Sequence, residues 1–147
     1  MRALAALILL AACARGPEPA SLPASLRDPS APVASQANAS LARLAGDWIV
    51  VEGAGVRPGA ALRIEGGVMT IDGRPHPLSV EGTGRFALSG QPLWVHWLDA
   101  DDRTAAMGDP SGGRVWIMDR RGAPGERLVA AHEILRWYGY DLAQLAR

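Results

Sequence analysis

The chain has 147 residues, a length typical of one domain. It carries 15 basic and 15 acidic side chains, and a formal net charge of zero argues against a nucleic-acid-binding surface. Its single cysteine excludes both an intrachain disulfide and a zinc site built from several thiolates.

The amino terminus has the features of a secretory signal. Arg2 precedes an apolar run, Ala3–Leu10, which is too short for the roughly 20 helical residues that span a bilayer. The run ends in Leu10-Ala11-Ala12-Cys13, which resembles the bacterial lipobox, in which the cysteine is diacylated and begins the mature chain. This resemblance implies that residues 1–12 are a signal peptide and that Cys13 is a lipid anchor. The alternative is an ordinary signal peptide with an incidental cysteine.

The same resemblance implies a location for the protein. Ala14, rather than an aspartate, follows the cysteine, which in this class of signal indicates the outer membrane of a Gram-negative bacterium. We therefore expect a lipid-anchored protein whose domain faces the periplasm. Residues 13–40 are rich in Ala, Pro and Ser, and prolines lack the N–H that helices and sheets need. They predict a disordered tether, with the folded domain at 41–147.

Eight short segments in that domain have the composition of strands and are separated by turn sequences rich in Gly and Asp. They are Trp48–Glu52, Ala60–Glu65, Val68–Asp72, His76–Glu81, Arg85–Leu88, Leu93–Leu98, Thr104–Gly108 and Arg114–Asp119. No helix has room to cross between them. The spacing predicts a mainly β fold, a small eight-stranded antiparallel up-and-down barrel.

One helix is predicted after the strands, over Pro124–Tyr138. An apolar stripe recurs along it at intervals of three and four residues, and Gly139 is placed to end it. The stripe consists of Leu128, Ala131, Leu135 and Tyr138.

Two motifs and their separation resemble those of the lipocalins, in particular the bacterial outer-membrane lipoprotein type related to apolipoprotein D. Gly46-Asp47-Trp48 opens the first strand, and Trp116-Ile117-Met118-Asp119-Arg120 closes the last one. The segment from Pro124 to Leu145 also resembles the carboxyl end of the bacterial members. Asp102 and Ile49 depart from the family, where aromatic residues are common.

The resemblance implies a helix packed on the barrel wall and a closed barrel end made by Gly46, Trp48 and Arg120. Glycine lets the backbone turn there, the indole plugs the barrel, and a cation–π contact holds the arginine against it. The alternative is a core tryptophan and an exposed arginine that never meet.

The resemblance also implies a ligand, a small hydrophobic or lipid-like molecule such as a lysophospholipid or a fatty acid. Lipid storage, transport or envelope maintenance would be the role. Strand alternation leaves two possible inner faces. One holds Trp94, His96, Trp116 and Met118; the other holds Leu93, Val95, Trp97, Val115 and Ile117. We favour the first because it combines bulk with polar groups, and the candidate ligand-binding residues are Trp94, His96, Met107, Trp116 and Met118.

No pattern in the sequence indicates catalysis, a cofactor or a metal. The three histidines lack partners at ligand spacing, and Asp99, Asp101 and Asp102 are interpreted as turn formers carrying solvated charge. We expect a binding protein and not an enzyme. Two alternatives stay open: a periplasmic protease-inhibitor barrel that acts through its exposed tether, and a structural barrel filled by its own side chains. Ligand identity and oligomeric state are also open.

Overall fold

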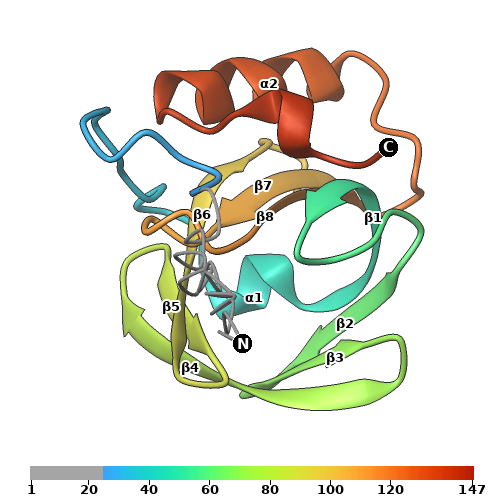
Figure 1. Ribbon diagram of the computed structural model, residues 1–147. Helices are drawn as coiled ribbons and strands as arrows, with labels where there is room; N and C mark the ends of the chain where they lie inside the picture. The colour runs from blue at the N-terminus through green and yellow to red at the C-terminus, as the bar shows by residue number, and fades with distance from the viewer. Residues whose placement is uncertain (1–24) are drawn as a thin grey trace, which may run out of the picture.

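The computed structural model describes residues 25–147. Eight antiparallel strands form a closed barrel in which each strand pairs with the next and the last returns to the first (Figure 1). The strands are β1 (Gly46–Ala54), β2 (Ala61–Glu65), β3 (Val68–Ile71), β4 (Arg74–Gly82), β5 (Arg85–Leu88), β6 (Gln91–Leu98), β7 (Thr104–Gly108) and β8 (Val115–Asp119). The predicted fold class, a mainly β up-and-down barrel of eight strands, is confirmed.

Two short helical segments and one longer helix complete the described chain. They are α1 (Leu41–Leu44), α2 (Arg127–Trp137) and the 3-10 helix η1 (Leu142–Gln144). Figure 1 shows α2 lying across the outside of the barrel, where it contacts β6 and β7. Gly139, with φ +84°, follows it and donates its N–H to the carbonyl oxygen of Arg136, so the predicted end of the helix is confirmed. Among the described helices, none combines the length and the apolar character needed to cross a membrane.

Because consecutive strands run in opposite directions, alternate connections meet at the same end of the barrel. The closed end holds α1, the start of β1 and the connections at residues 66–67, 83–84 and 99–103. The mouth holds the connections at residues 55–60, 72–73, 89–90 and 109–114.

Apolar side chains form two cores, one on each side of the barrel wall. Strand alternation sends one set into the barrel, where Trp48, Phe86 and Trp116 are the bulkiest members. The other set lies between the wall and α2, whose buried Ala131 and Leu135 contact it. The predicted apolar stripe therefore attaches α2 to the barrel.

Residues 25–40 form a strap along the outside of the barrel, and the prediction of a disordered tether is wrong for them. Arg27, only 7% exposed, donates to three carbonyl oxygens, those of Tyr138 at 2.7 Å, Pro110 at 3.0 Å and Ala31 at 2.5 Å. The strap thus links α2 to the β7–β8 connection. The remainder of the predicted tether, the signal peptide and Cys13 lie outside the described residues.

Gln36 holds the other half of the strap against β6. Its backbone N–H donates to Val95, and its side-chain oxygen accepts from the N–H of Leu98 at 2.8 Å. The prolines of this segment remove backbone donors, but its remaining polar groups find partners on the barrel instead of within the strap. Composition alone does not reveal such long-range pairing.

Candidate binding site at the barrel mouth

The closed end is sealed by the contact that the two motifs predict. The guanidinium of Arg120 lies over the Trp48 ring, 3.7 Å from its centroid, and the indole itself is buried. Trp48 donates its ring N–H to the carbonyl oxygen of Leu44 at 2.7 Å, which joins the plug to α1. Gly46 has φ +101°, and a Cβ there would stand 3.0 Å from the Arg120 guanidinium. Glycine is thus required by both backbone and space.

Arg120 also ties together the chain segments around the plug. Its guanidinium donates to the carbonyl oxygens of Arg43 at 2.9 Å, Ala45 at 2.6 Å and Asp102 at 2.9 Å. The planar group therefore covers the indole with one face while its edge bonds to backbone. The contact therefore closes the barrel end around Trp48.

The aspartates of the connection at 99–103 are held more firmly than a solvated turn requires. Asp99 is 8% exposed, accepts from the N–H groups of Arg103 and Thr104, and pairs with Arg127 at 2.7 Å. Burial alone would raise the pKa of Asp99, but these hydrogen bonds and the arginine outweigh it and lower the pKa. Asp101 also pairs with Arg127, and Asp102 with Arg43. The interpretation as solvated charge is therefore wrong for Asp99, which is buried, whereas the side chain of Asp101 is exposed and that of Asp102 is half-exposed.

Of the five candidate ligand-binding residues, three point into the barrel. Met107, Trp116 and Met118 all belong to the interior core and are fully buried. Trp94 and His96 do not join them. Trp94 pairs with Gly108 on β7, whereas its neighbour Val95 pairs with the inward-facing Met107. The two expected faces therefore each mix inward and outward residues.

A bulge in β6 adds to this mixing. The register with β7 shifts between Val95 and Trp97, so that Leu98 is inside the barrel even though Val95 is also inside. The extra residue is His96, which points away from the interior. An alternation rule counted along the strand cannot detect such a shift.

Both outward residues have other partners. Trp94 lies beneath the guanidinium of Arg85 at 4.2 Å. His96, 3% exposed, is enclosed by the strap and the carboxyl segment, with Nδ1 2.8 Å from the carbonyl oxygen of Ala34 and Nε2 2.8 Å from the hydroxyl of Tyr140. Burial lowers the pKa of His96 to about 4. The positions of Trp94 and His96 place them outside the barrel, so neither lines an interior ligand site.

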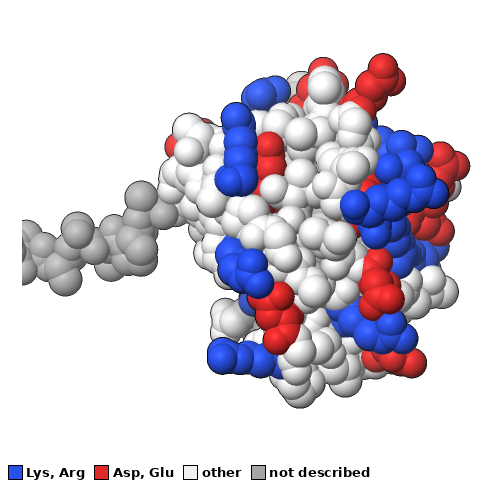
Figure 2. Space-filling model, turned by 90° about the vertical axis from the view of Figure 1, so that its right-hand side faces the viewer, with Lys and Arg blue, Asp and Glu red and all other residues white. Residues whose placement is uncertain are grey.

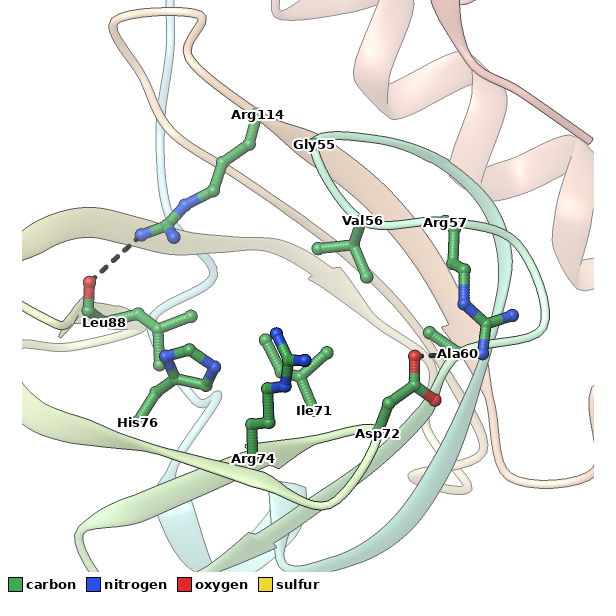
Figure 3. Close-up of a pocket in the computed structure, with 10 residues that line it drawn as sticks. All are labelled: Gly55, Val56, Arg57, Ala60, Ile71, Asp72, Arg74, His76, Leu88 and Arg114. Carbon is green, nitrogen blue, oxygen red and sulfur yellow. Dashed lines mark hydrogen bonds and ion pairs between the residues drawn. The ribbon is translucent and has the colours of Figure 1, made fainter.

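One space that opens into the barrel lies at its mouth. A cavity of about 540 Å³ opens there, within the range of small-molecule sites. Four of its lining residues are apolar, and most of the others are charged (Figure 3). The lining consists of Gly55, Val56, Arg57, Ala60, Ile71, Asp72, Arg74, His76, Leu88 and Arg114.

The charged lining is predominantly positive. Arg57 pairs with Asp72, the only acidic residue of the lining, at 3.0 Å. Figure 3 shows Arg74, His76 and Arg114 converging on the cavity from the start of β4 and the segment before β8. After the Arg57–Asp72 pair is set aside, two guanidinium groups remain to face a ligand. Such a lining favours an anionic group.

Arg114 is the most enclosed of these cations. It donates to the carbonyl oxygens of Leu88 and Gln91, each at 3.3 Å, while its Nε is buried without a partner among residues 25–147. Burial lowers the pKa of Arg114, and the charge of Asp109 acts in the opposite direction. Two residues further along the inward face, the buried ring N–H of Trp116 also has no partner within that range. Hydrogen-bond donors without a partner among residues 25–147 therefore lie inside and beside the cavity.

Sequence reasoning missed Arg57, Arg74, His76 and Arg114 as site residues. The available signal was their place in the chain, since each lies in or within a few residues of a connection that an up-and-down barrel brings to one end. Elsewhere on the surface, charges of both signs are intermixed, as Figure 2 shows for one face. Within residues 25–147 no group of His, Cys, Asp or Glu is arranged to hold a metal ion.

No protein-family model matches the chain, and no curated protein matches it either. The closed antiparallel barrel of eight strands with a carboxyl-terminal helix is consistent with a lipocalin-like fold.

Proposed function

We propose that this chain is a lipid-anchored, lipocalin-like carrier that binds a small anionic amphiphile at the barrel mouth. The observation that carries the proposal is the cavity of about 540 Å³, in which apolar walls occur together with two guanidinium groups that have no ion-pair partner among residues 25–147. A fatty acid or an anionic lysophospholipid has the matching chemistry. Its carboxylate or phosphate would face Arg74 and Arg114, with the first part of its chain against Val56, Ile71 and Leu88.

The depth of burial is limited by the filled half of the barrel. Trp48, Phe86 and Trp116 are each no more than 1% exposed and occupy the interior beyond the mouth. Each methylene that leaves water contributes about 0.8 kcal/mol, so a few buried methylenes together with an ion pair supply a few kcal/mol, which corresponds to binding in about the millimolar range. Affinity should therefore depend on the head group at least as strongly as on chain length.

The rest of the proposal follows the signal at the amino terminus. Cys13 would carry the acyl chains, and the domain would stand in the periplasm at the outer membrane of a Gram-negative cell. The function needs no chemical conversion of the ligand, so we propose a carrier and not an enzyme. Substitution of Cys13 by Ser, followed by acyl labelling and membrane fractionation, tests the anchor. Label that persists on the Cys13→Ser protein would contradict it.

The protease-inhibitor alternative is weakened by the strap. That alternative needs an exposed tether, whereas Arg27 and Gln36 bind residues 25–40 to the barrel and α2. The filled-barrel alternative is separated from the carrier by a titration. A shortened chain of residues 25–147, which retains the strap, is titrated with dodecanoate, lysophosphatidylglycerol and uncharged dodecanol by calorimetry and tryptophan fluorescence.

The carrier predicts saturable one-to-one binding of the two anions and binding of dodecanol weaker by at least about tenfold, or 1.4 kcal/mol. Arg74→Gln should weaken binding of the anions about three- to tenfold. The matched control is Arg121→Gln, an exposed arginine at the closed end, which should leave affinity unchanged. Absence of saturable binding by either anion would favour the filled barrel.

A further inference from the structure

The described chain enters the folded domain at the mouth. Ser25 donates its hydroxyl to the carbonyl oxygen of Ser111 at 3.3 Å, and the N–H of Leu26 donates to Gly112 at 3.0 Å. Both acceptors belong to the β7–β8 connection at residues 109–114, which is part of the mouth. Gly112 has φ +84°, and a Cβ there would collide with Ser25. The described chain therefore begins in a close contact with the β7–β8 connection at the mouth.

The length of chain before this point limits where a membrane anchor can lie. From Cys13 to Ser25 there are 25 − 13 = 12 residue steps, which span at most about 40 Å when fully extended. A strand of nine residues such as β1 covers about 30 Å along the barrel. If the closed end faced the membrane, the chain before Ser25 would need most of its reach to run along the barrel from the mouth to the membrane. If the mouth faced the membrane, none of that reach would be needed for this purpose.

Charge distinguishes the two ends in the same direction. The mouth cavity presents Arg57, Arg74 and Arg114 against the single carboxylate of Asp72. The closed end carries exposed or half-exposed carboxylates as well, but each of them is paired with an arginine. They are Asp47, Glu65, Asp101 and Asp102. An anionic lipid surface therefore attracts the mouth more strongly than the closed end, whose exposed charges are balanced by ion pairs.

An exposed tryptophan lies on the outer wall of the barrel, at the end of α2 that Arg27 joins to the mouth connection. Trp137, the last residue of α2, is 71% exposed. Arg27 donates both to the carbonyl oxygen of the next residue, Tyr138, and to the carbonyl oxygen of Pro110 in the mouth connection. Trp137 is preceded by Arg136, also exposed. Tryptophan beside a basic residue is typical of side chains that settle at a lipid–water interface.

We propose that the barrel docks mouth-first on the anionic surface of the membrane that holds its own anchor, through Arg57, Arg74, Arg114, Arg136 and Trp137. The inference rests on the proposed function, since it assumes the Cys13 anchor and an amphiphilic ligand. Ligand then passes between bilayer and cavity without crossing water. The membrane surface, and not a second protein, is the partner because the tether joins the mouth rim.

The test uses the full lipidated protein in vesicles, with a reporter at either end of the barrel. Gln91→Cys places a thiol at the mouth, and Val68→Cys places one at the closed end; both residues are exposed. Acylation occupies Cys13, so a fluorescent dye labels only the new thiol. Vesicles of phosphatidylcholine alone, or mixed with equal phosphatidylglycerol, carry lipids with a quencher on the head group.

Mouth-first docking predicts quenching at Gln91→Cys several-fold stronger than at Val68→Cys in the mixed vesicles, and a loss of this difference when salt is added. Trp137→Ala should reduce the quenching, while binding of dodecanoate in solution stays unchanged. Equal quenching at the two reporters, stronger quenching at Val68→Cys, or quenching at neither would overturn the proposal. Failure of dodecanoate binding with the quenching difference intact would instead count against the carrier function alone.

Discussion

Arg120 combines two roles at the closed end that other side chains cannot combine. Its flat face covers Trp48 at 3.7 Å, and its edge donates to backbone carbonyl groups of three segments. A lysine at this position would keep the charge but lose both the stacking face and most of the donors. The residue thus stabilises the end of the barrel opposite the mouth.

A double-mutant cycle measures this contact. Trp48→Ala should cost about 3–5 kcal/mol of unfolding free energy, because a buried ring is removed. Arg120→Ala combined with Trp48→Ala should reveal a coupling of roughly 0.5–3 kcal/mol in denaturant unfolding. Arg120→Lys should recover little of the loss, whereas Arg121→Ala should stay within about 0.5 kcal/mol of the parent. A coupling near zero would mean that the stacking contributes nothing.

His96 predicts a dependence of stability on pH. Its pKa is lowered to about 4 in the folded chain, mainly by burial, from an ordinary value of 6.5. Between these values the unfolded chain holds a proton that the folded chain lacks, so stability is complete above pH 6.5 and is lost as pH falls towards 4. The difference corresponds to about 3 kcal/mol for this group.

The variant His96→Gln isolates the effect, since it keeps one donor and one acceptor without a titrating group. Unfolding free energies of parent and variant are measured from pH 7 to pH 4. The parent should lose about 3 kcal/mol more than the variant across that range. Parallel curves would show that His96 is already protonated or solvated in the folded chain.

At the scale of elements, the strap shows how a proline-rich segment acquires structure. It contributes Arg27 to the junction of α2 and the mouth, and Gln36 to the edge of β6. These contacts join residues more than sixty positions apart in the chain. The strap therefore holds the helix, the barrel wall and the chain entry point in a fixed relation.

Removing the strap contact should loosen all three elements together. Arg27→Ala is expected to cost about 2–4 kcal/mol of unfolding free energy, because three carbonyl groups lose charged hydrogen bonds. Hydrogen exchange should accelerate in α2 and at residues 109–114 before it does so in β2 and β3. A loss below about 0.5 kcal/mol, the level expected for an ordinary surface residue, would show that the strap is only loosely held.

At the scale of the whole molecule, the barrel is divided between a filled half and an open mouth. The filled half supplies the hydrophobic core of a small domain, and the mouth supplies a large cavity whose lining combines arginines with apolar walls. Stability and binding are therefore assigned to different ends. This separation allows binding to be altered without unfolding the chain.

Blocking the mouth tests that assignment. Val56 is half-buried on the β1–β2 connection and points into the cavity in Figure 3. Val56→Trp should fill the space and weaken dodecanoate binding at least about tenfold, with unfolding free energy within about 1 kcal/mol of the parent. The matched control, Met118→Leu in the filled half, should leave binding unaffected because its volume is conserved. Unimpaired binding by Val56→Trp would place the ligand elsewhere.

Local pattern and turn chemistry in the sequence sufficed for the barrel, for most strand positions and for α2. Hairpin connections leave no room for other topologies, and the separated motifs at Trp48 and Arg120 indicated their contact. The tertiary structure alone decided which face of β6 is inside, because a single extra residue at His96 shifts the register. The tertiary structure also decided that the strap is ordered against the barrel and that several arginines lie together at the mouth. Those features arise from contacts between segments that are distant in the chain, and local sequence patterns do not reveal such contacts.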